Sequence, residues 1–179
     1  MLANIIDERD EYTYDHSDRV AEYARKIAEH LQLPLSTIDE IEMAGRIHDL
    51  GKIGIEDKIL LKKSKLTEEE FEKIKKHPEI AYRLLKKLKP YKEGVNYVLY
   101  HHERMDGKGY PCGISDKAIP LGARILAVAD SYDAMTTDRP YRRALSKAEA
   151  IEELRRNAGT QFDPTVVDIF IRLLENDTH

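Results

Sequence analysis

Apolar residues recur at helical spacing along nearly the whole chain, and this constrains the fold more than any other feature. One stripe runs from Val20 through Ala24 and Ile27 to Leu31, and it ends before Pro34. No segment has the alternation of a convincing strand, although residues 52–55 (KIGI) would suit a short extended piece. The pattern predicts an all-α fold: a single compact helical domain over residues 1–179, with about seven or eight helices.

Helix starts are marked by three pairs that fit the capping-box pattern, in which a Ser or Thr precedes an acid by three residues. These pairs are Ser36 with Asp39, Thr67 with Glu70, and Ser146 with Glu149. The only long stretch without helical spacing is roughly 103–119. Irregular segments of this length are uncommon in compact domains and are often functional, so this stretch is a candidate site.

Composition excludes several functional classes. The net charge of −4 makes a nucleic-acid polymer an unsuitable partner. The single cysteine rules out an intrachain disulfide, which suits a reducing compartment. No stretch has the roughly 20 apolar residues that a membrane span needs. We therefore expect a soluble, cytoplasmic protein with no membrane partner.

Five of the seven histidines stand out by their neighbours: His16, His48, His77, His101 and His102. His30 and His179 are expected at the surface. His48 lies on the inward face of its predicted helix and is followed directly by Asp49. A buried acid is costly unless it is paired, and a metal would pair with both side chains. The alternative is an ordinary helix end, which explains Gly51 and Lys52 but not the adjacent histidine and acid.

Asp130 follows a run of apolar and small residues on a helix that must pack inside. It therefore needs a partner, although a buried salt bridge or a turn toward solvent would also suffice. Asp133 lies one turn further on. Taken alone, His16 and His77 are more typical of caps or surface positions. Together, five imidazoles and two carboxylates exceed the four ligands of structural zinc and suit two octahedral metals, with iron or manganese favoured.

The order of these residues, H…HD…H…HH…D, resembles the HD superfamily of metal-dependent phosphohydrolases. The strings HHERMDGKGYPCG, HDLGKIGI and AVADSYDAMTTDRPYRRA resemble its HD-GYP subfamily. The resemblance spans residues 4–175. It implies an all-helical domain that hydrolyses cyclic di-GMP to pGpG, with a further cut to GMP left open.

The resemblance also implies roles for individual residues. One metal would be held by His16, His48, Asp49 and Asp130, and Asp49 would bridge to a second metal held by His77, His101 and His102. Lys52 would contact a substrate phosphate, and Tyr110, Arg139 and Arg142 would contact the dinucleotide. Asp10 and Asp133 would line the pocket. A hydroxide between the metals would attack phosphorus, and Asp133 or a water would protonate the leaving oxygen.

The chain departs from the family at one position. Some members hold a third metal through a Glu four residues before the first histidine, where this chain has Tyr12 beside Glu11. A tyrosine is a poor ligand unless deprotonated, so two metals are favoured over three.

Rival functions remain open from the sequence. The substrate could be another nucleotide, such as cyclic GMP-AMP or a nucleoside monophosphate. The domain could also be a non-catalytic binder of a cyclic dinucleotide. Read alone, the loop at Tyr110 could be a glycine-rich surface turn, and the arginines a solvated cluster. Signalling-protein partners and a homo-oligomer are also left open.

Overall fold

The computed structural model describes residues 15–62, 64–87, 93–138 and 143–176. The described elements are α2 (His16–His30), α3 (Leu35–Ile47), the 3₁₀ helix η1 (Leu50–Gly54), α4 (Asp57–Leu60), α5 (Glu68–Ile74), α6 (His77–Leu85), α7 (Gly94–Tyr100), the 3₁₀ helix η2 (Asp116–Ala118), α8 (Leu121–Thr136), α9 (Lys147–Asn157) and α10 (Pro164–Asn176). Within these ranges there is no strand, only an isolated bridge between Ala158 and Phe162. The all-α prediction is confirmed.

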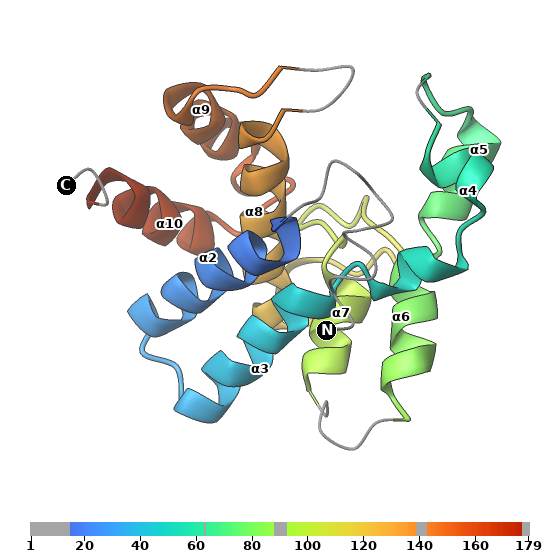
Figure 1. The fold of residues 1–179 in the computed structure, drawn as a ribbon. Coiled ribbons are helices and arrows are strands. Elements are labelled where there is room, and N and C mark those ends of the chain that lie inside the picture. The colour runs from blue at the N-terminus through green and yellow to red at the C-terminus, as the bar shows by residue number, and fades with distance from the viewer. Residues whose placement is uncertain (1–14, 63, 88–92, 139–142, 177–179) are drawn as a thin grey trace.

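Helix α8 runs through the centre of the molecule (Figure 1) and packs against α2, α3, α7, α9 and α10. Its buried face, which includes Leu126, joins aliphatic side chains of α2 and α3, such as Val20 and Ile41, in one core. Tyr23, Tyr132 and Phe170 close this core with edge-to-face ring contacts at 5.0–5.4 Å. These contacts fix α2 and α10 against α8.

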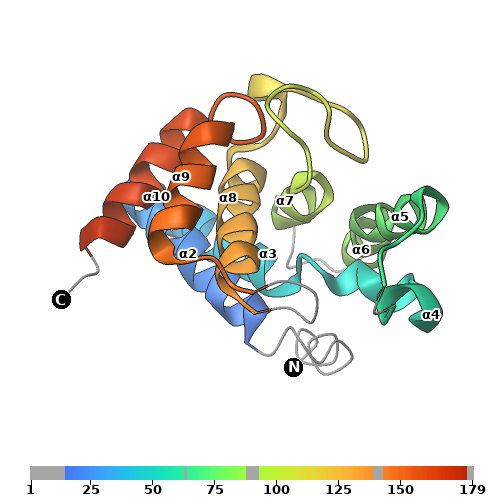
Figure 2. The same cartoon turned by 90° about the horizontal axis from the view of Figure 1, so that it is seen from above.

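Helices α4, α5 and α6 lie to one side of the bundle formed by α2, α8, α9 and α10 (Figure 2). Helix α6 joins them to the rest of the molecule, because it packs against both η1 and α7. This packing brings the start of α6 close to the end of α7.

Two of the three predicted capping boxes are confirmed by the structure. Thr67 and Ser146 each form a complete capping box with the acid three residues later. The box predicted at Ser36 is wrong, because α3 begins at Leu35 and the Pro34 carbonyl accepts the amides of Thr37 and Ile38. Residues 52–54 belong to the 3₁₀ helix η1 rather than to an extended piece. Among the described residues, no helix has the length and apolar character needed to cross a membrane.

Candidate metal centre

All seven predicted ligands lie in the described part of the chain, and helix ends bring them together. His16 and His77 are the first residues of α2 and α6. The other histidines follow the last residues of α3 and α7, and Asp130 lies within α8. The ligands thus come from five different helices and converge on one region.

Three histidines are oriented in the same way. His48, His77 and His101 each donate the Nδ1 hydrogen to the backbone carbonyl three residues earlier, at 2.7, 2.9 and 2.7 Å. Those carbonyls belong to the last turn of a helix and have no helical partner. Since a carbonyl only accepts, the proton sits on Nδ1 and the lone pair on Nε2. The local fold therefore selects the tautomer that a metal needs.

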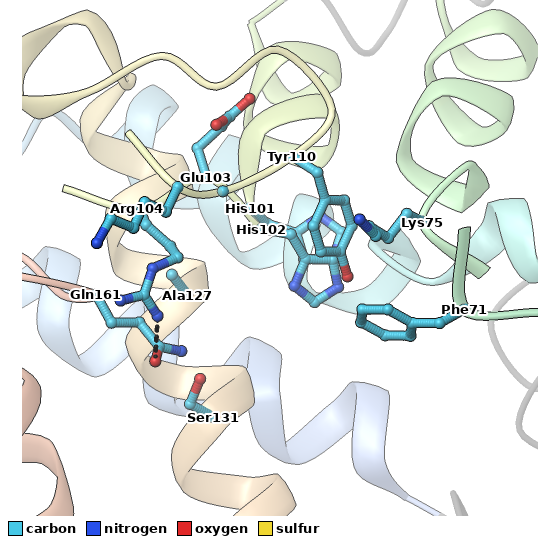
Figure 3. A pocket seen from close by; sticks show the side chains of 12 residues that line it. Phe71, Lys75, His101, His102, Glu103, Arg104, Tyr110, Ala127, Ser131 and Gln161 are labelled. Atoms are coloured by element: carbon cyan, nitrogen blue, oxygen red, sulfur yellow. Dashed lines mark hydrogen bonds between the residues drawn. The ribbon is translucent and has the colours of Figure 1, made fainter. Parts of the chain in front are cut away.

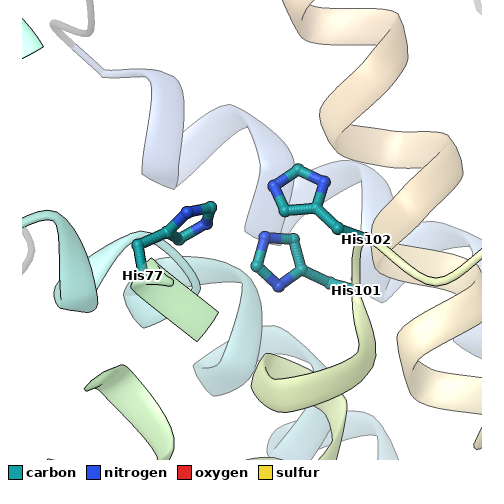
Figure 4. Close-up of side chains that lie close together, drawn as sticks. All are labelled: His77, His101 and His102. Atoms are coloured by element: carbon teal, nitrogen blue, oxygen red, sulfur yellow. The ribbon is translucent and has the colours of Figure 1, made fainter. Parts of the chain in front are cut away.

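The Nε2 atoms of these three histidines are buried and have no hydrogen-bond partner among the described residues. A buried polar atom without a partner costs about 1–3 kcal/mol. Figure 4 shows His77 facing His101 and His102 from the opposite side of the site. The carbonyl ends of α3 and α7 also carry partial negative charge, which favours a cation there. These observations fit bound divalent metal.

Asp49 turns its two carboxylate oxygens toward different histidines. Oδ1 lies 3.5 Å from Nε2 of His77, and Oδ2 lies 3.5 Å from Nε2 of His48 and 4.0 Å from Nε2 of His16. This arrangement suits a carboxylate that bridges two ions. Three groups of donor atoms lie within 4.8 Å of one another: His16 with His48 and Asp49, His48 with His101 and Asp130, and His77 with His101 and His102.

Gly51 allows Asp49 and His77 to approach each other. A Cβ atom at position 51 would lie 1.8 Å from the carbonyl oxygen of His77. Any other residue would push η1 away from the start of α6. The helix-breaking role that the sequence indicates for this glycine is thus accompanied by a packing role at the site.

Burial and charge set the protonation states. Burial raises the pKa of Asp49, but Lys52 and the surrounding imidazoles outweigh it and hold that pKa well below the usual range. Burial likewise raises the pKa of Asp130, but the hydrogen bond with His16 and the neighbouring imidazoles hold it well below the usual range. Burial lowers the pKa of His77 to about 3 and that of His101 well below 6.5. At neutral pH the carboxylates are anionic and these histidines neutral, as metal ligation requires.

Asp133 is held in two directions. Its Oδ2 lies 2.7 Å from Nδ1 of His16, and its Oδ1 accepts from Nε of Arg19 at 2.5 Å. Burial raises the pKa of Asp133, but the hydrogen bonds from His16 and Arg19 outweigh this effect, so the pKa lies below its usual value. An ionised carboxylate of this kind is better suited to orienting the His16 ring than to donating a proton. In this orientation Nε2 of His16 lies 3.4 Å from Oδ1 of Asp130. Arg19 has no feature in the sequence that would have revealed this role.

The loop after His102 folds back over it. The Tyr110 amide donates to the His102 carbonyl at 3.2 Å, and the two rings lie 4.8 Å apart at 31°. Gly107 has a φ of +73°, a left-handed conformation that favours glycine. Gly109 is needed for close approach, since a Cβ atom there would lie 2.5 Å from Cα of Glu103. Tyr110 and His102 line a pocket of about 290 Å³ (Figure 3).

Glu103 fixes this loop and was not predicted to act in the site. Its side chain is buried, and Oε1 accepts the amides of Cys112 at 2.6 Å and Gly113 at 3.0 Å. The sequence feature that could have indicated this role is the position of Glu103 directly after the paired histidines. Asp10, Arg139 and Arg142, predicted to contact substrate, lie outside the described residues, as do Glu11 and Tyr12.

A family model described as "HD domain" matches residues 1–166. The chain belongs to the HD domain family. The resemblance found in the sequence is thereby confirmed, and the family fits the histidine and aspartate groups that can hold a divalent metal.

Two curated relatives narrow the comparison. The chain is 41% identical over 175 residues to a cyclic di-GMP phosphodiesterase of Thermotoga maritima, covering 96% of this chain and 48% of that protein. It is 39% identical over 165 residues to 3'3'-cGAMP-specific phosphodiesterase 3 of Vibrio cholerae, covering 91% and 35%. The chain thus spans about half, or less, of the length of these HD domain proteins.

A solved structure confirms the fold. The crystal structure of a cyclic GMP-AMP specific phosphodiesterase of Vibrio cholerae superimposes with a TM-score of 0.78 at 17% identity, covering 98% of this chain and 47% of that one. The two chains therefore share the same helical fold.

Proposed function

We propose that this chain is a metal-dependent phosphodiesterase that hydrolyses cyclic di-GMP to linear pGpG, with GMP as a further product. The observation that carries the proposal is the placement of Asp49, whose two oxygens face different histidines beside the pocket lined by His102 and Tyr110. The named relatives supply the substrate class.

The proposed centre holds two divalent metals rather than three. One would be held by His16, His48, Asp49 and Asp130, and the other by His77, His101 and His102 with the second oxygen of Asp49. Mixed imidazole and carboxylate donors favour iron or manganese. Bound metals of this kind polarise phosphate oxygens and lower the pKa of a water molecule.

The remaining side chains would act on the substrate. Lys52 lies 2.6 Å from Asp49 and is partly exposed, so its ammonium group can contact a phosphate where negative charge develops. Burial raises the pKa of Tyr110, which keeps its phenol protonated and able to donate a hydrogen bond. We assign Asp133 to orienting His16, and a solvent water to protonating the leaving oxygen. The substrate contacts of Asp10, Arg139 and Arg142 stay predictions.

A second candidate substrate is 3'3'-cyclic GMP-AMP, which the 39% identity to the Vibrio enzyme favours. It would use the same ligands and the same Tyr110 loop. A purely binding role is disfavoured because all seven predicted ligand side chains are present and converge.

Product analysis tests the proposal. Protein purified without oxygen and loaded with iron or manganese is incubated with cyclic di-GMP, 3'3'-cyclic GMP-AMP or GMP, and the products are separated by chromatography. We expect pGpG from cyclic di-GMP, no turnover by Asp49→Asn, and unchanged turnover by Asp39→Asn, an exposed carboxylate on α3. Metal-loaded protein that binds a cyclic dinucleotide without cleaving it would instead establish the binding role.

A further inference from the structure

Helix α5 places an exposed aromatic ring beside the metal centre. Phe71 is 47% exposed and lines the same pocket as His102 and Tyr110. None of the described residues of α5 is fully buried. Phe71 therefore adds little to the core, and its position is better explained by what it presents to the pocket.

A cation lies between this ring and the loop. Nζ of Lys75 is 5.3 Å from the centroid of the Phe71 ring and 5.9 Å from that of Tyr110. Lys75 also pairs with Glu72, an exposed side chain on the same helix. Figure 3 shows Lys75 and Phe71 on one side of the pocket, with Tyr110 over His102 between them and the opposite wall. Phe71, Lys75 and Tyr110 therefore line the same pocket as the predicted metal ligand His102.

We propose that Phe71 and Lys75 form a purine wall that selects guanine in the dinucleotide substrate, an inference that rests on the proposed function. The π-face of Phe71 stacks on the base, as exposed aromatic rings do in proteins that bind single-stranded nucleic acids. Lys75 has only donors, and it donates to the edge of the base.

The edge of guanine suits Lys75 better than that of adenine. Guanine presents two acceptors there, O6 and N7, whereas adenine presents one acceptor and an amino donor. An ammonium group has three N–H donors and no acceptor, so it is repelled by that amino group.

The test compares substrates with and without bases, using the metal-loaded protein. Phe71→Ala is measured on cyclic di-GMP and on an abasic dinucleotide, a phosphodiester of 1,2-dideoxyribose units that has no base and no aromatic ring, with the products of both separated by chromatography. We expect the KM for cyclic di-GMP to rise roughly tenfold more than the KM for the base-free diester. Phe71→Tyr, which keeps a ring, should retain most of the affinity. Leu61→Ala removes another exposed apolar side chain, outside the pocket, and is the matched control.

Lys75 is tested by base preference. Lys75→Met keeps the aliphatic stem but removes the ammonium group. It should lower the ratio of kcat/KM for cyclic di-GMP to kcat/KM for cyclic di-AMP. Lys73→Met, on the same helix but outside the pocket, should leave this ratio unchanged. An unchanged ratio in Lys75→Met overturns the role of Lys75.

The outcomes separate this inference from the proposed function. Equal losses of Phe71→Ala on both substrates, or a Phe71→Ala that matches Leu61→Ala, overturn the purine wall while cyclic di-GMP cleavage stands. A wild-type protein that cleaves the base-free diester but neither binds nor cleaves a cyclic dinucleotide overturns the proposed function, and the purine wall with it.

Discussion

His16 and Asp133, 117 residues apart in the sequence, are joined by a 2.7 Å hydrogen bond between Nδ1 and Oδ2. The bond turns Nε2 of His16 toward Asp130 and Asp49. Carboxylates that hold a ligating histidine in this way raise its basicity and fix its ring. The pair therefore links the packing of α2 against α8 to the affinity of the centre.

Asp133→Asn should weaken metal binding about 10–100-fold, because the anionic acceptor that orients His16 is lost. Metal affinity is measured by titration of the metal-free protein, and kcat is measured at saturating metal. Asp18→Asn, which changes an exposed carboxylate on α2, the helix that carries His16, is the control. A variant with normal metal affinity but a large loss of kcat would show that Asp133 donates a proton instead.

Metal should stabilise the fold through His77. A ligand at 1000 times its Kd adds about 4 kcal/mol to the free energy of unfolding. We expect denaturant titration to show a gain of this order for the wild type and a much smaller gain for His77→Leu. The metal-free His77→Leu protein should be close to the metal-free wild type, since the loss of the Nδ1 bond to the Ile74 carbonyl is offset by the removal of a buried Nε2 that has no partner among the described residues. A full metal-induced gain in His77→Leu would exclude His77 as a ligand.

The metal-free protein should lose stability on acidification. His77 has a folded-state pKa of about 3, and the pKa of His101 lies well below 6.5, because both rings are buried. Below pH 6.5 the unfolded chain then binds more protons than the folded chain, so the free energy of unfolding falls as pH falls. The pKa of His16 is raised to about 10, so its contribution is already complete below pH 6.5.

Thermal unfolding of the metal-free protein between pH 7 and 4.5 measures this effect. Each such histidine contributes up to about 1.4 kcal/mol per pH unit. His77→Leu should show a shallower fall than the wild type. Identical profiles for the two proteins would contradict the neutral, buried state of His77.

Glu103→Ala should loosen the loop that carries Tyr110. The amides of Cys112 and Gly113 lose their acceptor, at a cost of about 1–3 kcal/mol. Hydrogen exchange by mass spectrometry should show faster exchange over residues 107–113, and the KM for cyclic di-GMP should rise. Glu79→Ala, a substitution on α6 outside the pocket, is the control. Unchanged exchange in the loop would remove Glu103 from this role.

The sequence predicted the ligands better than it predicted their supports. His48, Asp49 and the paired histidines are recognisable because a costly acid or a rare pair stands at the end of an apolar helix face. The bond between His16 and Asp133 depends on how α2 meets α8, and no local pattern encodes that contact. The same holds for Phe71, whose helix must first be placed beside the loop of Tyr110.

Local errors have a similar cause. The pattern at Ser36 satisfies the capping rule, yet Pro34 starts α3 earlier because its carbonyl accepts the first helical amides. Residues 50–54 form a 3₁₀ helix, since Gly51 must lie against the carbonyl of His77. In both places a neighbour in space or sequence decides between conformations that the local residues allow.

The most direct test of the central claim is a metal titration of the protein stripped and handled without oxygen, followed by elemental analysis and turnover of cyclic di-GMP. We expect about two equivalents of iron or manganese per chain, with cleavage appearing only as the second is bound. Full turnover by the metal-free protein, or loss of neither metal in Asp49→Asn, would contradict it.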